Sequence, residues 1–87
     1  MTDAQKTAAL EIMDLFKQAI WEVDQKQLDD LELNHQISSL GIDSVAMLEV
    51  IGFLEDELEI HLPDEMLANV KTVGDLAMAV SKVRAAA

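Results

Sequence analysis

The sequence predicts an all-α fold, a small four-helix bundle of three main helices and one short helix with a long first loop. Glycine and proline are scarce, at three and one residues, and runs of β-branched residues are absent. Apolar residues recur at steps of three and four, the spacing that gathers side chains on one face of a helix. With 87 residues the chain can bury one modest core. We therefore expect a single domain over residues 1–87.

The first helix is expected to start at Thr2 or Asp3, because either side chain can cap free backbone amides. It is expected to fade near Trp21 or Val23. One apolar face follows from the spacing of six residues: Ala9, Ile12, Met13, Phe16, Ala19 and Ile20.

Residues 24–42 break this pattern and predict a loop that is long for so small a domain. Apolar residues spread along this segment should pin it to the core: Leu28, Leu31, Leu33, Ile37 and Leu40. We therefore expect an ordered, packed loop with a helical turn around residues 28–33.

The second helix is expected from about Ser44 to Leu58, with Asp43 as its cap. At 100° per residue its positions separate into two arcs. The arc predicted to face the core comprises Met47, Ile51, Leu54 and Leu58. A second arc mixes small apolar groups with acids, which suits contact with a partner: Val45, Leu48, Glu49, Gly52 and Asp56.

Two further helices are expected after residue 62. Pro63 suits the first turn of a short helix through about Asn69. Residues 72–75, "TVGD", resemble a capping box with aspartate as its acid and predict the start of the last helix. Its buried stripe is predicted to contain Leu76, Ala79, Val80 and Val83.

Charge is the strongest global feature of the composition. Seventeen acids oppose six bases, a formal net charge of −11. Such a surface disfavours nucleic acid and anionic membranes and attracts basic protein surfaces, although acidity also simply aids solubility. No apolar run approaches the roughly 20 residues of a membrane span, and the N-terminus lacks a secretion signal. We expect a cytoplasmic protein, and Met1 with the short alanine tail suggests a free-standing chain.

The residues that could support catalysis or metal binding are few. Cysteine is absent, and nothing places His35 or His61 near Ser44, so a hydrolase with Ser44 as nucleophile has little support. A calcium loop beginning at Asp24 would need an acid or amide where Lys26 stands, and it fails at most other ligand positions. We expect no catalytic residue and no metal site.

Ser44 has two possible roles. It stands where a helix begins, so its hydroxyl could serve as a cap, yet Asp43 already supplies one. A helix N-terminus also favours a phosphate, because backbone amides and the helix dipole point at it. The position therefore permits a phosphate-linked modification without requiring one.

A longer motif surrounds Ser44: "LGIDSV", residues 40–45, is followed by "MLEVIGFLEDELEIHLPDE". This stretch resembles the acyl carrier proteins, with Glu49 and the "LPD" turn in the family's register. Downstream, "VKTVGDLAMAV" is similar to the start of the family's last helix. The resemblance extends over about residues 28–84.

This resemblance implies a function. A phosphopantetheinyl transferase would attach 4′-phosphopantetheine from coenzyme A to Ser44, and Asp43 beside it would contribute to partner recognition. The arm's thiol would hold acyl groups as thioesters, so the protein, a monomer, would be a carrier and not an enzyme. Acyl- or ketoacyl-transferring enzymes with basic patches would dock on Val45, Leu48, Glu49, Gly52 and Asp56. The acyl chain or core would be lined by Met47, Ile51, Leu54 and Leu58.

Two departures from fatty-acid carriers leave the pathway open. Ala46 replaces a usual acid, and Gly52 replaces a bulky apolar residue. Fatty-acid, polyketide and specialised lipid synthesis all remain possible, as do an aminoacyl or peptidyl carrier and an unmodified docking domain. For Gly52, a notch for a partner side chain and a close helix–helix contact are both open.

Overall fold

The computed structural model describes residues 2–86, which form four α-helices and one 3₁₀ turn. In chain order these are α1 (Asp3–Asp24), η1 (Ile37–Leu40), α2 (Ser44–Leu58), α3 (Asp64–Leu67) and α4 (Val73–Ala86). β-Type pairing within these residues is limited to one isolated bridge, Gln36 with Thr72. The all-α prediction is confirmed. The expectation of a free-standing chain was drawn from Met1 and the alanine tail, and Met1 lies outside the described residues.

Helix α1 is the element against which the others pack. A capping box starts it: the Gln5 amide donates to Oγ1 of Thr2 (3.1 Å), and Oε1 of Gln5 accepts from the Thr2 amide (2.9 Å). It ends at Asp24, where Gln25 takes a left-handed conformation. The predicted apolar face is confirmed, since all six of its residues are buried: Ala9, Ile12, Met13, Phe16, Ala19 and Ile20.

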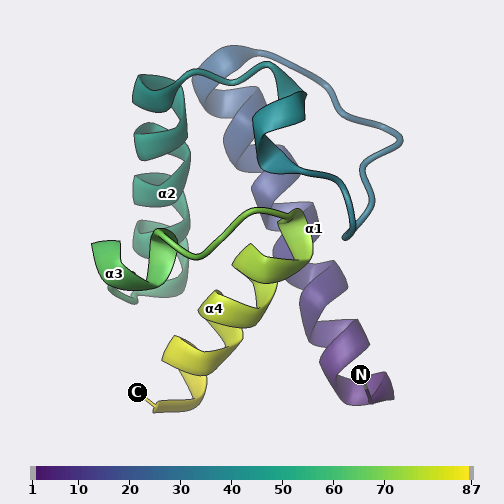
Figure 1. Ribbon diagram of the computed structural model, residues 1–87, viewed down its shortest axis with the longest axis vertical. Helices are drawn as coiled ribbons and strands as arrows, with labels where there is room; N and C mark the ends of the chain where they lie inside the picture. The colour runs from purple at the N-terminus through teal and green to yellow at the C-terminus, as the bar shows by residue number, and fades with distance from the viewer. Residues whose placement is uncertain (1, 87) are drawn as a thin grey trace.

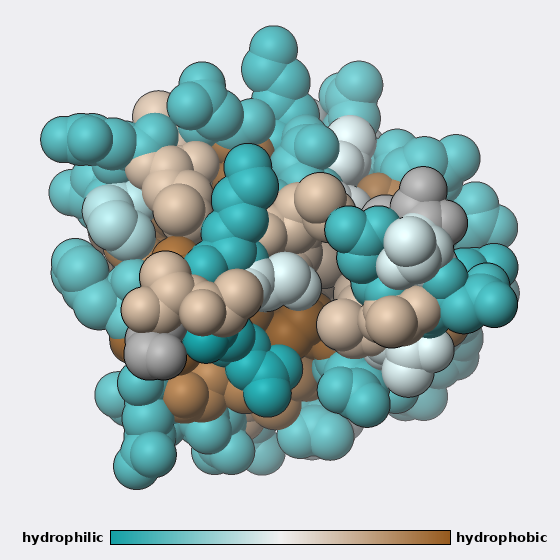
Figure 2. All heavy atoms as spheres, turned by 90° about the horizontal axis from the view of Figure 1, so that it is seen from below, coloured by the Kyte–Doolittle hydropathy of each residue, from teal (hydrophilic) through white to brown (hydrophobic). Residues whose placement is uncertain are grey.

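Helices α2 and α4 both pack on α1, and the short α3 contacts α4 (Figure 1). The core lies where these helices meet. Its largest fully buried side chains are Phe16, Ile20, Val50, Leu54, Val73, Leu76 and Val80. Seen from the end that carries both termini, hydrophilic residues cover most of the face and hydrophobic ones are visible in the hollow between them (Figure 2).

The predicted bounds of α2 are confirmed, but its buried face is turned slightly from the predicted arc. Ile51 and Leu54 are buried as expected, whereas Met47 and Leu58 are only half-buried. Val50, which the prediction left out, is completely buried. Met47 and Leu58 share the buried side of α2 with Val50, Ile51 and Leu54, but they lie near the two ends of the helix.

The long loop is ordered and packed, as predicted, but its helical turn lies elsewhere. Leu31 is buried, and the other four apolar residues pack against the core: Leu28, Leu33, Ile37 and Leu40. The turn expected at residues 28–33 is wrong. That segment holds only simple turns, at residues 29–30 and 33–34, and the helical turn is Ile37–Leu40.

Backbone hydrogen bonds to the start of α4 explain this difference, because they fix Leu33, His35 and Ile37 in place. Gly74 permits the closest contact, since an added Cβ would lie 3.0 Å from the carbonyl oxygen of Leu33. Three N–H groups donate to carbonyl oxygens across the pair of segments: Ile37 to Lys71 (2.9 Å), Val73 to His35 (3.0 Å) and Gly74 to Leu33 (2.7 Å).

The last two helices start close to where the sequence predicts. Pro63 is the cap of α3 and not part of its first turn, and α3 ends at Leu67, two residues before the predicted end. The capping box of α4 is confirmed: the Asp75 amide donates to Oγ1 of Thr72 (3.0 Å), and Oδ2 of Asp75 accepts from the Thr72 amide (3.1 Å). In the predicted α4 stripe three residues are buried and the fourth is half-buried: Leu76, Ala79, Val80 and Val83.

Within residues 2–86, no helix has the length and apolar character that crossing a membrane requires.

Leu54→Ala should cost about 2–5 kcal/mol of unfolding free energy, because it leaves a cavity in a fully packed site. Leu48→Ala on the same helix is the matched control: its side chain is 68% exposed, so we expect a loss of no more than about 0.5 kcal/mol. Urea unfolding followed by circular dichroism measures both. Equal losses would contradict the assignment of these two faces.

Asp75→Asn should destabilise the protein at neutral pH. Hydrogen bonds from the backbone amides of Thr72 and Lys71 lower the pKa of Asp75 below its ordinary value of 3.8. A lowered folded-state pKa means stabilisation that is present above the unfolded pKa and lost as pH falls through the folded one. The stability difference between wild type and variant, from urea unfolding at several pH values, should therefore shrink below pH 3.8. A difference independent of pH would count against this cap.

Candidate functional site

Ser44 is the first residue of α2 and is exposed. The helix is capped by Asp43, whose Oδ1 accepts a hydrogen bond from the Ala46 amide (2.8 Å). The Ser44 hydroxyl makes no hydrogen bond with any other group in residues 2–86. Capping is thus done by Asp43, and the Ser44 hydroxyl is left for another use.

The backbone amides beside this hydroxyl are also available. In the first turn of α2 the Ala46 amide bonds to the Asp43 side chain and the Met47 amide to the Asp43 carbonyl (2.9 Å). The amides of Ser44 and Val45 have no partner among the described residues. Two free N–H groups at the positive end of a 15-residue helix favour an anionic group bonded to Ser44.

The chain approaches Ser44 through a turn that only glycine fits well. Gly41 ends η1 with a φ of 73°, in the left-handed region. Its carbonyl oxygen accepts a hydrogen bond from Nζ of Lys26 (2.6 Å), which also pairs with Asp24 (3.7 Å). A Cβ on Gly41 would lie 2.9 Å from this same Nζ. Lys26 therefore holds Gly41, three residues before Ser44, against the segment that follows α1.

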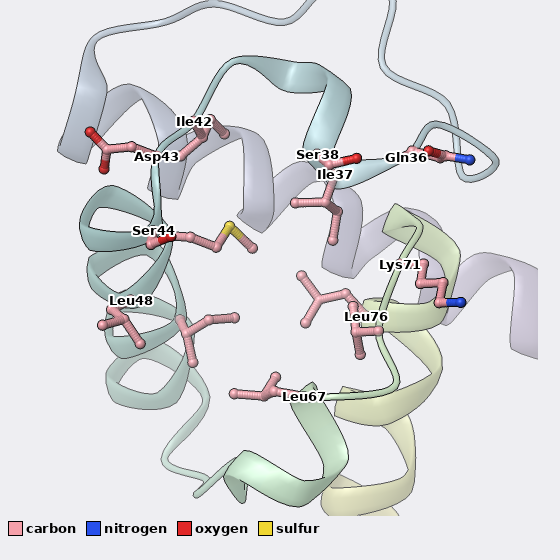
Figure 3. A pocket seen from close by; sticks show the side chains of 13 residues that line it. Gln36, Ile37, Ser38, Ile42, Asp43, Ser44, Leu48, Leu67, Lys71 and Leu76 are labelled. Carbon is pink, nitrogen blue, oxygen red and sulfur yellow. The ribbon is translucent and has the colours of Figure 1, made fainter.

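A cleft of about 810 Å³ opens beside Ser44. It lies between α2 on one side and η1, the segment after α3 and the start of α4 on the other (Figure 3). Its lining is mainly aliphatic: Ile37, Ile42, Met47, Leu48, Ile51, Leu67, Val70 and Leu76, together with Gln36, Ser38, Asp43, Ser44 and Lys71.

The charged groups of this lining face outward. Figure 3 shows Ile37, Leu67 and Leu76 directed into the space, whereas the Asp43 carboxylate and the Lys71 amino group point away from it. An apolar chain that entered the cleft would contact aliphatic side chains, and a buried charge would find no partner there.

Of the four residues predicted to line the acyl chain or core, Met47 and Ile51 line this cleft. Leu54 is fully buried in the core, and Leu58 is half-buried and also outside the cleft lining. Leu48, predicted only for docking, lies on the cleft rim. The sequence interpretation missed cleft residues that come from the loop and the later helices: Ile37, Ile42, Leu67, Val70 and Leu76. Their apolar character was visible, but nothing local to them indicates that they meet α2.

The arc of α2 predicted for docking lies on the surface. Val45 and Leu48 are 67% and 68% exposed, unusual values for large apolar side chains, and Glu49 and Asp56 are exposed beside them. Gly52 stands among them, and a Cβ added to it would meet nothing within 4 Å. The close helix–helix contact considered for Gly52 is therefore wrong. Glycine at this helical position costs about 1 kcal/mol relative to alanine with no packing gain in return.

Neither histidine lines the cleft beside Ser44. Nδ1 of His35 accepts a hydrogen bond from the Glu32 amide (3.1 Å). His61 is largely exposed, with its Nδ1 3.2 Å from Oε2 of Glu55. A search of the described residues finds no group of three or more histidine or acidic side chains placed to hold a metal ion.

Comparison with known protein families identifies the family of the chain. The family model described as "Phosphopantetheine attachment site" matches residues 14–80, most of the chain. The chain belongs to the acyl carrier protein family. The prosthetic group of this family is 4′-phosphopantetheine, which is bound covalently. The N-terminus of α2 fits such a group, because an exposed hydroxyl stands there beside two free amides.

Individual relatives agree. An acyl carrier protein homolog of Ureaplasma parvum is 41% identical over 51 residues, 59% of this chain and 66% of the relative. An acyl carrier protein of Rhodococcus erythropolis is 36% identical over 63 residues, 72% and 59% of the two chains. An acyl carrier protein of Clostridium perfringens is 50% identical over 40 residues, which are 46% of this chain and 53% of the relative. The chain thus spans 53–66% of the length of these relatives. No solved structure matches it.

Two variants of Asp43 should separate its capping role from its charge. Asp43→Ala removes the acceptor for the Ala46 amide and should cost about 0.5–2 kcal/mol of unfolding free energy. Asp43→Asn keeps an equally good cap and should stay close to wild type in the same urea titration. If the two variants lose equal stability, the carboxylate charge matters more than the cap.

Proposed function

We propose that the chain carries acyl groups on a 4′-phosphopantetheine arm attached to Ser44. In this proposal it presents them to enzymes of fatty-acid, polyketide or specialised lipid synthesis. The observation that supports this most directly is the position of Ser44: an exposed hydroxyl at the start of α2, at the edge of an apolar cleft. The chain itself catalyses nothing in this scheme, and acts as the substrate of other enzymes.

Attachment requires Ser44 to react with coenzyme A in the active site of a phosphopantetheinyl transferase. The Ser44 oxygen attacks the phosphorus that bears the pantetheine, and the bond from that phosphorus to the bridging oxygen of the diphosphate breaks. The hydroxyl proton leaves to a base of the transferase, and 3′,5′-adenosine bisphosphate departs. This chain contributes an accessible oxygen and a rigid helix end, since Asp43 holds the first turn without using the Ser44 hydroxyl.

When bound, the arm supplies a thiol that holds an acyl group as a thioester. The chain contains no cysteine that could do this itself. Its aliphatic cleft residues then shelter the acyl chain from water. Each methylene transferred from water is worth about 0.8 kcal/mol, so even four sheltered methylenes contribute about 3 kcal/mol. An enzyme must overcome that energy to draw the chain out.

The composition of the cleft favours aliphatic cargo. The charged lining groups Asp43 and Lys71 point away from the interior (Figure 3). An aminoacyl group would bring an ammonium into a space without a partner for it, which is costly. Among the possible carriers, one for aliphatic acyl groups therefore has more support than one for amino acids or peptides.

The outward face of α2 is the proposed docking surface for the partner enzymes. It consists of Val45, Leu48, Glu49, Gly52 and Asp56, with Asp43 at its end next to Ser44. The net charge of −11 attracts basic patches and speeds encounter at low salt. The exposed apolar pair, Val45 and Leu48, supplies contact area once the surfaces meet.

Intact mass after incubation with coenzyme A, magnesium and a broad-specificity phosphopantetheinyl transferase tests the proposal. We expect a gain of one phosphopantetheinyl group, because Ser44 is exposed and unbonded. Ser44→Ala should gain nothing, whereas Ser38→Ala, a change of an exposed serine six residues away, should gain the full group.

No mass gain on wild-type protein that is folded by circular dichroism would refute the carrier function and leave an unmodified docking domain. A mass gain that persists in Ser44→Ala would instead place the arm on another residue.

A further inference from the structure

Lys26 joins two parts of the chain that are 15 residues apart. Its Nζ donates a hydrogen bond to the carbonyl oxygen of Gly41 at 2.6 Å, a short contact of the charge-assisted kind. The same Nζ lies 3.7 Å from Oδ2 of Asp24, the last residue of α1. The Lys26 side chain is 41% exposed, so this contact is made at the surface and its removal opens no cavity in the core.

The segment that Lys26 holds is short and has few other contacts. Gly41 and Ile42 stand between η1 and Asp43, the cap of α2. The bond from Lys26 is the only hydrogen bond that joins either of them to another part of the described chain. Ile42 adds apolar packing, because its half-buried side chain contacts the core. Figure 3 shows this segment leading from η1 to Ser44 at the start of α2.

The backbone of Gly41 sets the direction in which the chain leaves η1. Its φ of 73° is in the left-handed region, which glycine adopts more readily than other residues. Glycine is also the residue with the most conformational freedom when nothing restrains it. A Cβ at this position would lie 2.9 Å from Nζ of Lys26, so the amino group sits directly against the turn. Lys26 therefore restrains the most flexible point on the approach to Ser44.

The first turn of α2 depends on where this segment places Asp43. Asp43 accepts two hydrogen bonds, one at Oδ1 from the Ala46 amide (2.8 Å) and one at its carbonyl oxygen from the Met47 amide (2.9 Å). Both require its extended conformation, with φ −76° and ψ 171°. Ser44 follows directly, and its own amide has no partner among the described residues. If the segment before Asp43 moves, these bonds weaken and Ser44 frays with the helix end.

We propose that Lys26 is a positioning residue for attachment of the arm. By holding Gly41 it keeps the first turn of α2 formed, and so keeps the Ser44 oxygen placed to attack the phosphorus of coenzyme A. The proposal rests on the proposed function, because it takes Ser44 as the attachment point. A misplacement of about 1 Å caused by a change far from the chemistry can cost about 100-fold in rate, so a surface contact can have a large effect.

Three variants separate this role from a simple effect of charge. Lys26→Met removes the donor and keeps an unbranched side chain. Lys6→Met is the matched control, because it makes the same change at an exposed position of α1 that forms no ion pair among the described residues. Both variants carry the same net charge, so any change in long-range attraction is shared. Lys26→Arg keeps a positively charged donor and tests whether the contact can be restored.

Kinetics of arm attachment by a broad-specificity phosphopantetheinyl transferase give the first readout. For Lys26→Met we expect kcat to fall about tenfold, because Ser44 is less well placed in the bound complex. The KM for the carrier should stay near wild type, since the outward face of α2 is unchanged. Lys6→Met should match wild type in both constants, and Lys26→Arg should recover most of kcat.

Amide hydrogen exchange followed by NMR gives a second readout that needs no transferase. In Lys26→Met the amides of Ala46 and Met47 should exchange roughly tenfold faster, because both bond to Asp43 and the helix end opens more often. The amide of Leu54, in the buried part of α2, should exchange as in wild type. Such a local change shows that the fold as a whole is intact.

A kcat for Lys26→Met equal to that of Lys6→Met would overturn the positioning role, and so would a fall that Lys26→Arg leaves in place. Faster exchange at Leu54 as well as at Ala46 would also overturn it, because Lys26 would then support the whole fold. Failure of the proposed function looks different, because the wild-type chain would then gain no arm at all.

Discussion

The short backbone pairing between residues 33–37 and residues 71–74 is the constraint on which the site depends. Residues 25–43 form a loop whose ordering costs entropy. Backbone hydrogen bonds from Ile37, Val73 and Gly74 fix its middle against the start of α4, and buried Leu31 anchors it further. The loop thereby becomes one wall of the cleft, and its last residues deliver the chain to Ser44 in a defined direction.

This arrangement separates the side of α2 that holds the fold together from the sides left for function. Val50 and Leu54 are fully buried and hold α2 in the core. Met47, on the cleft side, is only half-buried, and Leu48 is exposed. Apolar surface that a simple bundle would bury is left accessible beside Ser44, where in the proposed function an acyl chain would cover it.

The sequence was a good guide wherever a local signal decides the structure. Helix periodicity predicted the buried face of α1, and cap residues predicted the starts of α1, α2 and α4. Ser44 and the outward arc of α2 followed from the same reasoning, aided by a family motif. These features depend on residues within a few positions of one another, which is why they could be predicted.

Features set by distant contacts were missed. The loop's helical turn lies at Ile37–Leu40 and not at residues 28–33, because backbone hydrogen bonds to the start of α4 fix Leu33, His35 and Ile37. Val50 was left out of the core because which flank of α2 is buried depends on where α1 lies. The cleft walls from Leu67, Val70 and Leu76 were missed for the same reason: nothing in their own segments indicates that they face Ser44.

Methyl-resolved NMR of the arm-bearing protein, with and without an octanoyl group on its thiol, tests most directly whether the cleft beside Ser44 shelters the cargo. If it does, loading shifts the methyl signals of Ile37, Met47 and Leu76 and produces cross-relaxation between these methyls and the octanoyl chain. Signals of Leu28, which lines a separate hollow beside α1, should stay in place. Unchanged cleft signals on a fully loaded protein would show that the chain stays in solvent, and would contradict the sheltering role of the cleft.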